Sequence, residues 1–414
     1  MTNYKLVITK ILKHPLFTGS AIMVIGHNIF NIGQFFYYFL TIRLLNTTEY
    51  GDLAAIISIL GIIGIIQLAF GLTIVKFVAS QKTEAAVSNL IKWFNYWGFL
   101  AGGIAAVLLL LLSPIASIFL NLTQPKLFYL ISPMFFLLVI VYVYRSVLQG
   151  LLLFKTYIAS LLVDVVIRIS FTALLILLGT ALFGAIIGMF IGIISGFIIT
   201  RSALNPYFSG KRGLKPKIMP LLKYSFPVLI QGLAFTSFYS TDILLVKHFF
   251  SPHDAGTYAY LSVLGRIAMF CTSPITSTMF PIIAKRFASN LPYLKIFYIC
   301  FLLVTGISLF VVLIFKLVPD IPISLLNKNE GQDILWWFGL FMAFLGIALL
   351  FEQFYLSIGK TKPVWFFVAA AALQAVFIWF IHPSLFSVVQ ISVLSTALLN
   401  IALFVYFPYY RRHG

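Results

Sequence analysis

The sequence predicts an all-α polytopic membrane protein, and two observations lead to this prediction. Of the 414 residues, 61% are hydrophobic and only 9% are charged, whereas soluble domains carry roughly 25% charged residues. Apolar stretches also recur along the whole chain. Because a helix needs about 20 mostly apolar residues to cross a bilayer, these stretches are interpreted as membrane spans rather than as the core of a soluble domain.

About twelve transmembrane helices are expected, each with about 18 or more mostly apolar residues. The first span is too long to be the apolar core of a signal peptide, so it is expected to be retained. A short basic, amphipathic segment precedes it. The expected spans are 16–42, 53–79, 91–113, 127–149, 157–179, 182–201, 221–246, 256–284, 293–315, 334–358, 364–381 and 385–407.

The distribution of basic residues predicts the orientation of the chain. With the N-terminus in the cytoplasm, 21 of the 28 lysines and arginines fall on the cytoplasmic side, five on the outer side and two within spans. Such an excess is typical of cytoplasmic loops. We therefore expect a multi-pass protein of the cell (plasma) membrane with both termini in the cytoplasm. The net charge of +18 comes from short loops, so no nucleic-acid partner is expected.

The longest cytoplasmic loop divides the chain near its middle. Residues 202–220 contain proline, glycine and four basic residues. The predicted domains are an N-terminal six-helix lobe at 1–201, a basic cytoplasmic linker at 202–220 and a C-terminal six-helix lobe at 221–414. No loop is long enough to hold a folded domain, and the loops offer few catalytic groups, so no enzymatic activity is expected.

The two halves resemble each other where a span begins on the outer side. The segment LNTTEYGDLAAIISILG (45–61) resembles FSPHDAGTYAYLSVLG (250–265), and both contain an acidic residue two positions before a glycine. Parallel repeats of six spans are typical of transporters, in which a central cavity between the halves binds the substrate. The alternative is chance similarity within a biased composition.

Span 5 carries a polar seam. Ser160, Asp164, Arg168 and Thr172 recur at steps of four in this span, so they share one helix face. Charged side chains inside a membrane are costly and usually face a cavity or a partner. Asp164 and Arg168 either form a neutral pair that holds helices together or line a substrate path.

Span 1 carries a second polar stripe, formed by His27, Asn31, Gln34 and Tyr38, with Asn28 beside it. Two interpretations remain open. The stripe either lines a cavity or holds helices together through hydrogen bonds between their side chains.

Spans 7 and 8 place opposite charges in apolar surroundings. Arg266 lies ten residues into span 8, about 15 Å deep, while Asp242 lies near the outer end of span 7 with Lys247 beyond it. Arg266 either pairs with Asp242 or a backbone carbonyl of a neighbouring helix, or faces a cavity and binds an anionic group. Glu352, near the inner end of span 10, is a further candidate unless it sits in the membrane interface.

Motifs of other chemistries are absent from the sequence. There is no phosphate-binding glycine loop, no zinc-like spacing and no serine–histidine constellation. The two cysteines fall within expected spans and are interpreted as small buried residues. We expect no cofactor and no metal.

The segment TDILLVKHFFSPHDAGTYAYLSVLGRIAMFCTSPITSTMFP (241–281) resembles the polysaccharide (Wzx-type) flippases of the multidrug/oligosaccharidyl-lipid/polysaccharide (MOP) exporter superfamily. Residues 43–61 are similar to that family's first-loop pattern of arginine, acid–Tyr–Gly and a small-residue helix. This resemblance implies two six-helix lobes around a cationic cavity. It also implies transfer of an oligosaccharide linked to a polyprenyl diphosphate from the cytoplasmic to the outer leaflet by alternating access. Arg266 matches the position of an arginine that lies in the cavity of related flippases.

The polar residues within the spans, together with the resemblance, give the candidate residues for substrate binding and ion coupling. The candidate cavity residues are Arg266, Asp242, Arg168, Asp164, Asn31, Gln34, Asn28, His27, Lys247 and Arg43, and the candidate ion-coupling residues are Asp164, Asp242 and Glu352.

Three functions can be compared. The leading hypothesis is a lipid-linked oligosaccharide flippase for polysaccharide or glycan biosynthesis, whose partners are its substrate, membrane lipids and candidate glycan-assembly proteins. The alternative is a multidrug/cation antiporter of the same superfamily, although the acid that such members carry in span 1 is missing here. A membrane glycosyltransferase or polymerase would need catalytic acids on a large outer loop, and the longest outer loop, 316–333, is short.

Overall fold

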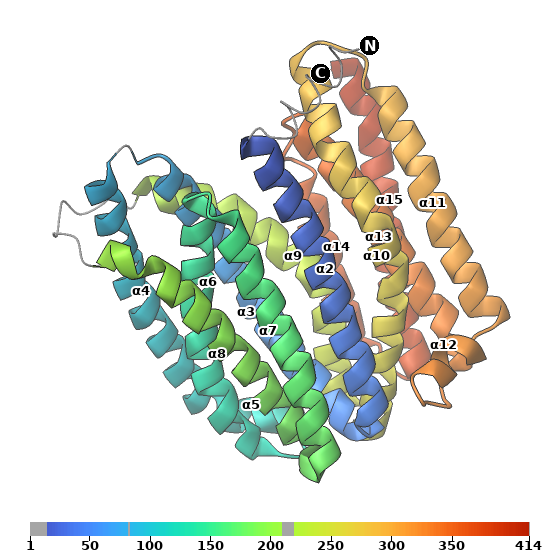
Figure 1. The fold of residues 1–414 in the computed structure, drawn as a ribbon. Helices are drawn as coiled ribbons and strands as arrows, with labels where there is room; N and C mark the ends of the chain where they lie inside the picture. Colours follow the sequence, from blue (N-terminus) through green and yellow to red (C-terminus); the bar gives the residue numbers. More distant parts are fainter. Residues whose placement is uncertain (1–14, 82, 209–218, 414) are drawn as a thin grey trace, which may run out of the picture. The chain divides into compact units, whose positions relative to one another are not determined.

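The computed structural model describes residues 15–81, 83–208 and 219–413, which are almost entirely helical and contain no strand (Figure 1). The all-α prediction is therefore confirmed. Residues 209–218, which belong to the expected linker, lie outside the described part of the chain. The first half contains α2 (Pro15–Leu44), α3 (Thr47–Ala79), α4 (Glu84–Leu111), α5 (Ser113–Phe119), α6 (Phe128–Gly150), α7 (Phe154–Leu175) and α8 (Ala181–Phe208). The second half contains α9 (Met219–Phe249), α10 (Pro252–Ala288), α11 (Leu294–Leu317), α12 (Asp320–Leu325), α13 (Gln332–Ser357), α14 (Val364–Phe380) and α15 (Leu385–His413).

The order of helix lengths is the same in both halves. Each half has three long helices, one short helix and three more long helices, and the short members are α5 and α12. Each expected span lies on a long helix of its own. The long and short helices thus follow one another in the same order in the two halves that contain the similar segments 45–61 and 250–265.

The helices are suited to a membrane. By length and composition, nine helical stretches within the described residues can cross a bilayer; one of them, Phe154–Phe208, contains both α7 and α8. Large apolar side chains such as Leu111 and Leu302 are 68% and 69% exposed, which is expected where lipid rather than water surrounds a helix. The chain is a multi-pass membrane protein, and the number of twelve crossings stays a prediction.

The described chain forms two compact units, and α3 contributes to both. The N unit comprises Met1–Leu45 and Ile63–Leu229, and the C unit comprises Asn46–Ile62 and Ile230–Gly414. The first half of α3 therefore packs with helices from the second half of the sequence. The lobes expected at 1–201 and 221–414 stay a prediction.

Capping residues fix where the two repeated segments begin. Asn46 Oδ1 accepts a hydrogen bond from the Glu49 N–H at 2.8 Å, and Glu49 Oε2 accepts one from the Asn46 N–H at 3.3 Å, which is a reciprocal cap. In α10, Ser251 Oγ accepts from the Asp254 N–H at 3.1 Å, and Pro252 occupies the first turn. Because of this cap, α10 begins four residues before the expected start at 256.

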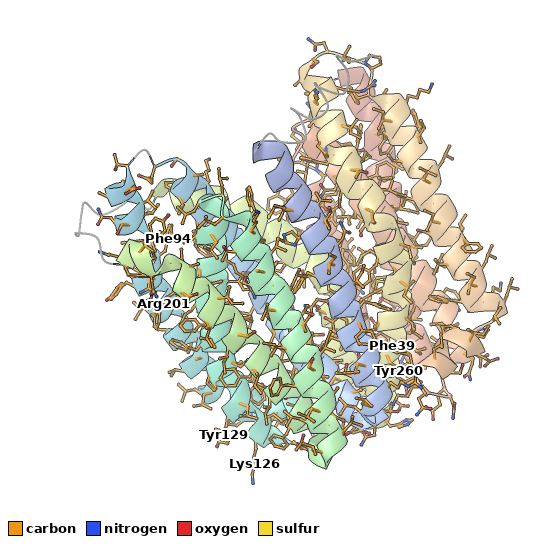
Figure 2. The ribbon with its side chains drawn as sticks, viewed as in Figure 1. Phe39, Phe94, Lys126, Tyr129, Arg201 and Tyr260 are labelled. Carbon is orange, nitrogen blue, oxygen red and sulfur yellow. The ribbon has the colours of Figure 1, made fainter. Side chains whose placement is uncertain are left out.

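In the N unit, α7 packs against α8 and α2, and α4 packs against α6. A buried apolar cluster lies where α3, α4, α6 and α8 meet, and it includes Ile74, Phe94 and Leu204. Figure 2 places Phe94 and Arg201 towards one end of this unit and Lys126 and Tyr129 at the other. Arg201 and Lys126 were expected on the cytoplasmic and outer sides, respectively, so their placement within the N unit agrees with the expected alternation of the spans.

In the C unit, α10 and α13 form the largest helix pair (Figure 1). α11 packs against both of them, α15 packs against α13, and α14 packs against α15. The helix that carries Arg266 is therefore supported on two sides by long apolar helices.

Candidate functional site

The polar seam of α7 is buried in the N unit as one continuous face. Ser160, Asp164, Arg168 and Thr172 are 0%, 1%, 9% and 0% exposed. Burial of all four confirms that residues at steps of four share one side of this helix. The seam faces other protein helices, which removes its charges from the hydrocarbon.

Asp164 lies between two arginines. Its Oδ2 is 3.0 Å from Arg145 Nη2 on α6, and its Oδ1 is 2.6 Å from Arg168 Nη2, one turn further along α7. Arg145 also donates from Nε to Ser160 Oγ at 3.1 Å and from Nη2 to the Ser160 carbonyl oxygen at 2.8 Å. Two guanidinium groups around one carboxylate leave a net positive charge in the buried centre of the N unit.

Arg145 was not among the candidate site residues, because it lies four residues before the end of the expected span 127–149 and was counted with the cytoplasmic basic residues. In the structure it lies inside α6 and is 7% exposed. The sequence does contain a signal for this contact. The link between α6 and α7 is only three residues long, and Arg145 lies seven residues before its middle residue while Ser160 lies eight residues after it. An antiparallel helix pair therefore brings the two residues close together.

Small residues on α8 permit this arrangement. Gly188, Gly192 and Gly196 recur at steps of four opposite the polar seam. A Cβ atom on Gly192 would lie 2.9 Å from Asp164 Oδ1, and one on Gly196 would lie 2.6 Å from Arg145 Nη2. The glycines thus allow α8 to approach α7 closely enough to enclose the charges, as small residues do at membrane helix interfaces.

Some polar residues of α2 contact α7, and others are exposed. Gln34 Oε1 accepts from Arg168 Nη1 at 2.9 Å, and His27 Nε2 lies 3.3 Å from the Tyr157 hydroxyl. Asn28 and Asn31 are exposed. The stripe therefore serves helix packing at His27 and Gln34, whereas cavity lining stays a prediction for Asn28 and Asn31. Arg43, at the end of α2, is also exposed.

In the C unit, Arg266 is buried but only partly bonded. It lies fourteen residues after the first residue of α10, about 21 Å along the helix, and is 9% exposed. Its Nη2 donates to the Tyr239 carbonyl oxygen on α9 at 2.9 Å, and its guanidinium lies over the Tyr239 ring at 4.9 Å. Arg266 Nε has no hydrogen-bond partner among the described residues.

Asp242 forms no direct ion pair with Arg266. Asp242 is fully buried, and its carboxylate accepts hydrogen bonds from the Tyr258 hydroxyl and the Ile243 N–H, each at 2.8 Å. Within the described residues it forms no ion pair. Of the two contacts considered for Arg266, the direct pair with Asp242 is not formed, because each group is held by a different neighbour. The hydrogen bond to a backbone carbonyl of a neighbouring helix is present.

Lys247 pairs instead with Asp52, a residue that sequence analysis did not single out. The Lys247 Nζ to Asp52 Oδ1 distance is 2.6 Å, and the two side chains are 1% and 0% exposed. Asp52 directly follows Gly51 of the repeated motif. This ion pair joins the first half of α3 to α9 within the C unit.

Two more buried polar side chains of the C unit, Glu352 and Gln374, form hydrogen bonds but no ion pair within the described residues. Glu352 on α13 is 3% exposed, is hydrogen-bonded by Gln231, and has one carboxylate oxygen, Oε1, without a hydrogen-bond partner. Gln374 on α14 donates to the Phe238 carbonyl oxygen at 3.1 Å and to Ser392 Oγ at 2.8 Å. Glu352 is thus buried among protein helices of the C unit, and Gln374 ties α14 to α9 and α15.

The model of one protein family, described as "Polysaccharide biosynthesis protein", matches residues 16–287, which is more than half of the chain. The chain belongs to the polysaccharide biosynthesis protein family. No curated protein matches it.

Solved structures with the same fold are MOP-type transporters and flippases. An inward-facing multidrug resistance MATE family transporter of the MOP superfamily has a TM-score of 0.69 at 13% identity, covering 93% of this chain and 96% of that one. The inward closed conformation of the lipid II flippase MurJ has a TM-score of 0.69 at 15% identity, covering 92% and 87%. At these identities the likeness concerns the fold, which agrees with the all-helical fold that the resemblance implied; the twelve spans and the two six-helix lobes stay predictions.

The family match and the fold together bound the function. The chain is a multi-pass membrane protein of the polysaccharide biosynthesis protein family, and its fold is similar to those of a MATE family transporter and of the lipid II flippase MurJ. Within the described residues, no group of three or more histidine, cysteine, aspartate and glutamate side chains is placed to hold a metal ion.

Proposed function

We propose that this protein is a flippase that moves a polyprenyl-diphosphate-linked oligosaccharide from the cytoplasmic to the outer leaflet for polysaccharide or glycan biosynthesis. The proposal rests on the family match and on one structural observation, the incompletely bonded guanidinium of Arg266. A buried charge in a membrane helix costs at least about 2.5 kcal/mol. A buried arginine without a direct ion pair destabilises the helix bundle, so its presence indicates a function. We infer that Arg266 binds an anionic ligand.

The geometry of Arg266 suits a diphosphate. Its Nη2 and its ring contact with Tyr239 fix the plane of the guanidinium, while Nε–H stays without a partner. A guanidinium fixed in this way can donate to phosphate oxygens with little loss of side-chain entropy. Asp242 does not compete for this donor, because Tyr258 and the backbone occupy its carboxylate.

The N unit offers a second positive centre. Arg145, Asp164 and Arg168 carry a net positive charge, and Arg168 Nε has no hydrogen-bond partner within the described residues. We propose that this centre assists in attracting the anionic head group. The exposed amides of Asn28 and Asn31 are proposed as contacts for sugar hydroxyls, since an amide both donates and accepts hydrogen bonds.

The proposal includes a topology. Twelve crossings form two six-helix lobes, both termini lie in the cytoplasm, and the protein resides in the plasma membrane. The distribution of 28 lysines and arginines and the repeated order of helix lengths support it. Transfer then proceeds by alternating access, in which one repeat moves against the other.

Ion coupling is proposed for Asp242 or Glu352 rather than for Asp164. Asp164 already pairs with two arginines, so it has no free charge for a proton or a sodium ion. Asp242 and Glu352 are both buried and form no ion pair within the described residues. A carboxylate that is buried without a cation is suited to bind and release one during a transport cycle.

The runner-up is a multidrug/cation antiporter, which the fold alone does not distinguish from a flippase, because MATE and MurJ structures match with the same TM-score of 0.69. Depletion of the protein in its host separates the two. The flippase proposal predicts that lipid-linked oligosaccharide accumulates and becomes inaccessible to an impermeant lectin at the outer leaflet, while ethidium accumulation is unchanged. Unchanged lectin labelling with increased ethidium accumulation would support the antiporter instead.

A further inference from the structure

A polar pocket of about 310 Å³ lies at one end of the C unit. This volume is at the lower end of the roughly 300–1,000 Å³ of small-molecule sites. Tyr260, one of its residues, is labelled in Figure 2 at the end of this unit where Figure 1 shows α12. Every lining residue has a side chain that can hydrogen-bond: Asn46, Thr47, Tyr260, Asn327, Lys328, Asn329 and Glu330.

The segment 327–331 forms one wall and is fixed against α10. The Tyr260 hydroxyl donates to the Glu330 carbonyl oxygen at 2.8 Å, and Thr257 Oγ1 lies 3.4 Å from Glu330 Oε2. Gly331 has a φ of +88°, and a Cβ atom there would lie 2.5 Å from Leu261 Cδ1. Only glycine fits this close approach without strain, so the wall is held in place before any ligand arrives.

The opposite wall is the start of α3. The reciprocal cap between Asn46 and Glu49 fixes the orientation of the Asn46 side chain. Glu49 also acts on Lys328 from this side: burial lowers the pKa of the Lys328 ammonium, and the nearby Glu49 carboxylate opposes that shift. Both walls are therefore built from residues whose positions are already determined by the fold.

We propose that this pocket binds a neutral saccharide unit of the exported glycan. Asparagine amides both donate and accept hydrogen bonds, as sugar hydroxyls do, and three asparagines line the pocket. The formal charges of Lys328 and Glu330 cancel, so the lining does not favour a strongly anionic group such as a diphosphate. The inference rests on the proposed function for the source of the saccharide and for the outer location of the pocket.

The pocket is a separate subsite from Arg266. Six residues of α10 separate Tyr260 from Arg266, about 9 Å along the helix. Arg266 contacts Tyr239 on α9, whereas Tyr260 contacts the 327–331 segment. In the proposed orientation, the links before α3 and before α13 lie on the outer side. The pocket thus holds sugar that has already crossed the membrane.

The experiment measures binding of free glycan to the full-length protein in detergent. The probe is the oligosaccharide that mild acid releases from the host's own lipid-linked intermediates. Its binding to the protein is measured by saturation-transfer NMR. The test variant combines Asn327→Gly with Asn329→Ala. Asn290→Gly is a matched control, because Asn290 and Asn327 are both exposed with φ of +54° and +59°, so glycine relieves the same strain at each.

Wild-type protein should bind the oligosaccharide saturably, and the Asn327→Gly/Asn329→Ala variant should bind it about tenfold more weakly, as expected when hydrogen bonds between the protein and the ligand are lost. The Asn290→Gly control should match wild type. An absence of saturable binding to wild type, or equal binding by the variant, overturns the pocket proposal. Transport of the intact glycolipid by wild-type proteoliposomes is measured separately, so its failure identifies an error in the proposed function and not in the pocket.

Discussion

Gly51 of α3 and Gly256 of α10, the two glycines of the repeated motif, touch each other through their backbones. A Cβ atom on Gly51 would lie 2.9 Å from the Gly256 nitrogen, and one on Gly256 would lie 1.8 Å from the Thr47 carbonyl oxygen. Each helix therefore begins where it crosses the other. This contact explains why the first half of α3 belongs to the C unit.

Alanine at either glycine should lower stability, because both Cβ atoms would meet backbone. Gly256→Ala should be the worse of the two, because its Cβ would lie 1.8 Å from a backbone atom and that of Gly51→Ala 2.9 Å. We expect a lower thermal unfolding temperature of the detergent-solubilised protein for both variants. Gly103→Ala is the control, since nothing lies within 4 Å of its Cβ position on α4 and alanine favours a helix by about 0.5–1 kcal/mol. Equal effects of Gly256→Ala and Gly103→Ala would contradict the close crossing.

The pairing of Asp164 with two arginines predicts a large effect of its removal. Asp164→Asn leaves Arg145 and Arg168 buried without a counter-charge, and breaking a buried pair in this way costs about 3–5 kcal/mol. Thermal unfolding and the amount of protein in the membrane should both fall. Asp320→Asn, on the exposed first turn of α12, should leave both unchanged. A stable Asp164→Asn protein would show that the arginines have other partners.

The Lys247–Asp52 pair can be tested by a double-mutant cycle. Lys247→Met or Asp52→Leu alone should destabilise the protein strongly, because each leaves one buried charge. The double variant should recover much of the lost stability, since both charges are then replaced by apolar groups. Glycan export by a stable double variant would show that Lys247 acts in packing; loss of export with full stability would instead support its role in the substrate path.

Glu352 allows a test of ion coupling. Glu352→Gln keeps the size of the side chain and its contact with Gln231 but removes the titratable group. If Glu352 couples transport to an ion gradient, the variant should be stable and should transport at a rate that no longer responds to an imposed proton or sodium gradient. A variant that responds to both gradients as wild type does would exclude Glu352 and leave Asp242 as the candidate.

Local periodicity predicted most of the fold, and contacts distant in sequence explain what it missed. The α7 seam was predictable because steps of four keep residues on one helix face. On α2, His27 and Gln34 are seven residues apart and both contact α7, whereas Asn31 of the same stripe is exposed. Periodicity alone could not separate the packed members of the stripe from the exposed one. The partner of Lys247 could not be predicted, because Asp52 comes from the other half of the chain and no local pattern joins them.

Arg266 is proposed to bind the anionic head group of a glycolipid that the protein moves across the membrane. The most direct test measures transfer of a fluorescent polyprenyl-diphosphate-linked oligosaccharide in proteoliposomes. We predict rapid transfer by wild type and by the control Lys126→Gln, which changes an exposed residue. Arg266→Gln should lose transfer. This variant should remain folded, because its side-chain amide can still donate to the Tyr239 carbonyl oxygen. Transfer by folded Arg266→Gln at the wild-type rate, or by wild type at the rate of protein-free liposomes, would contradict this proposal.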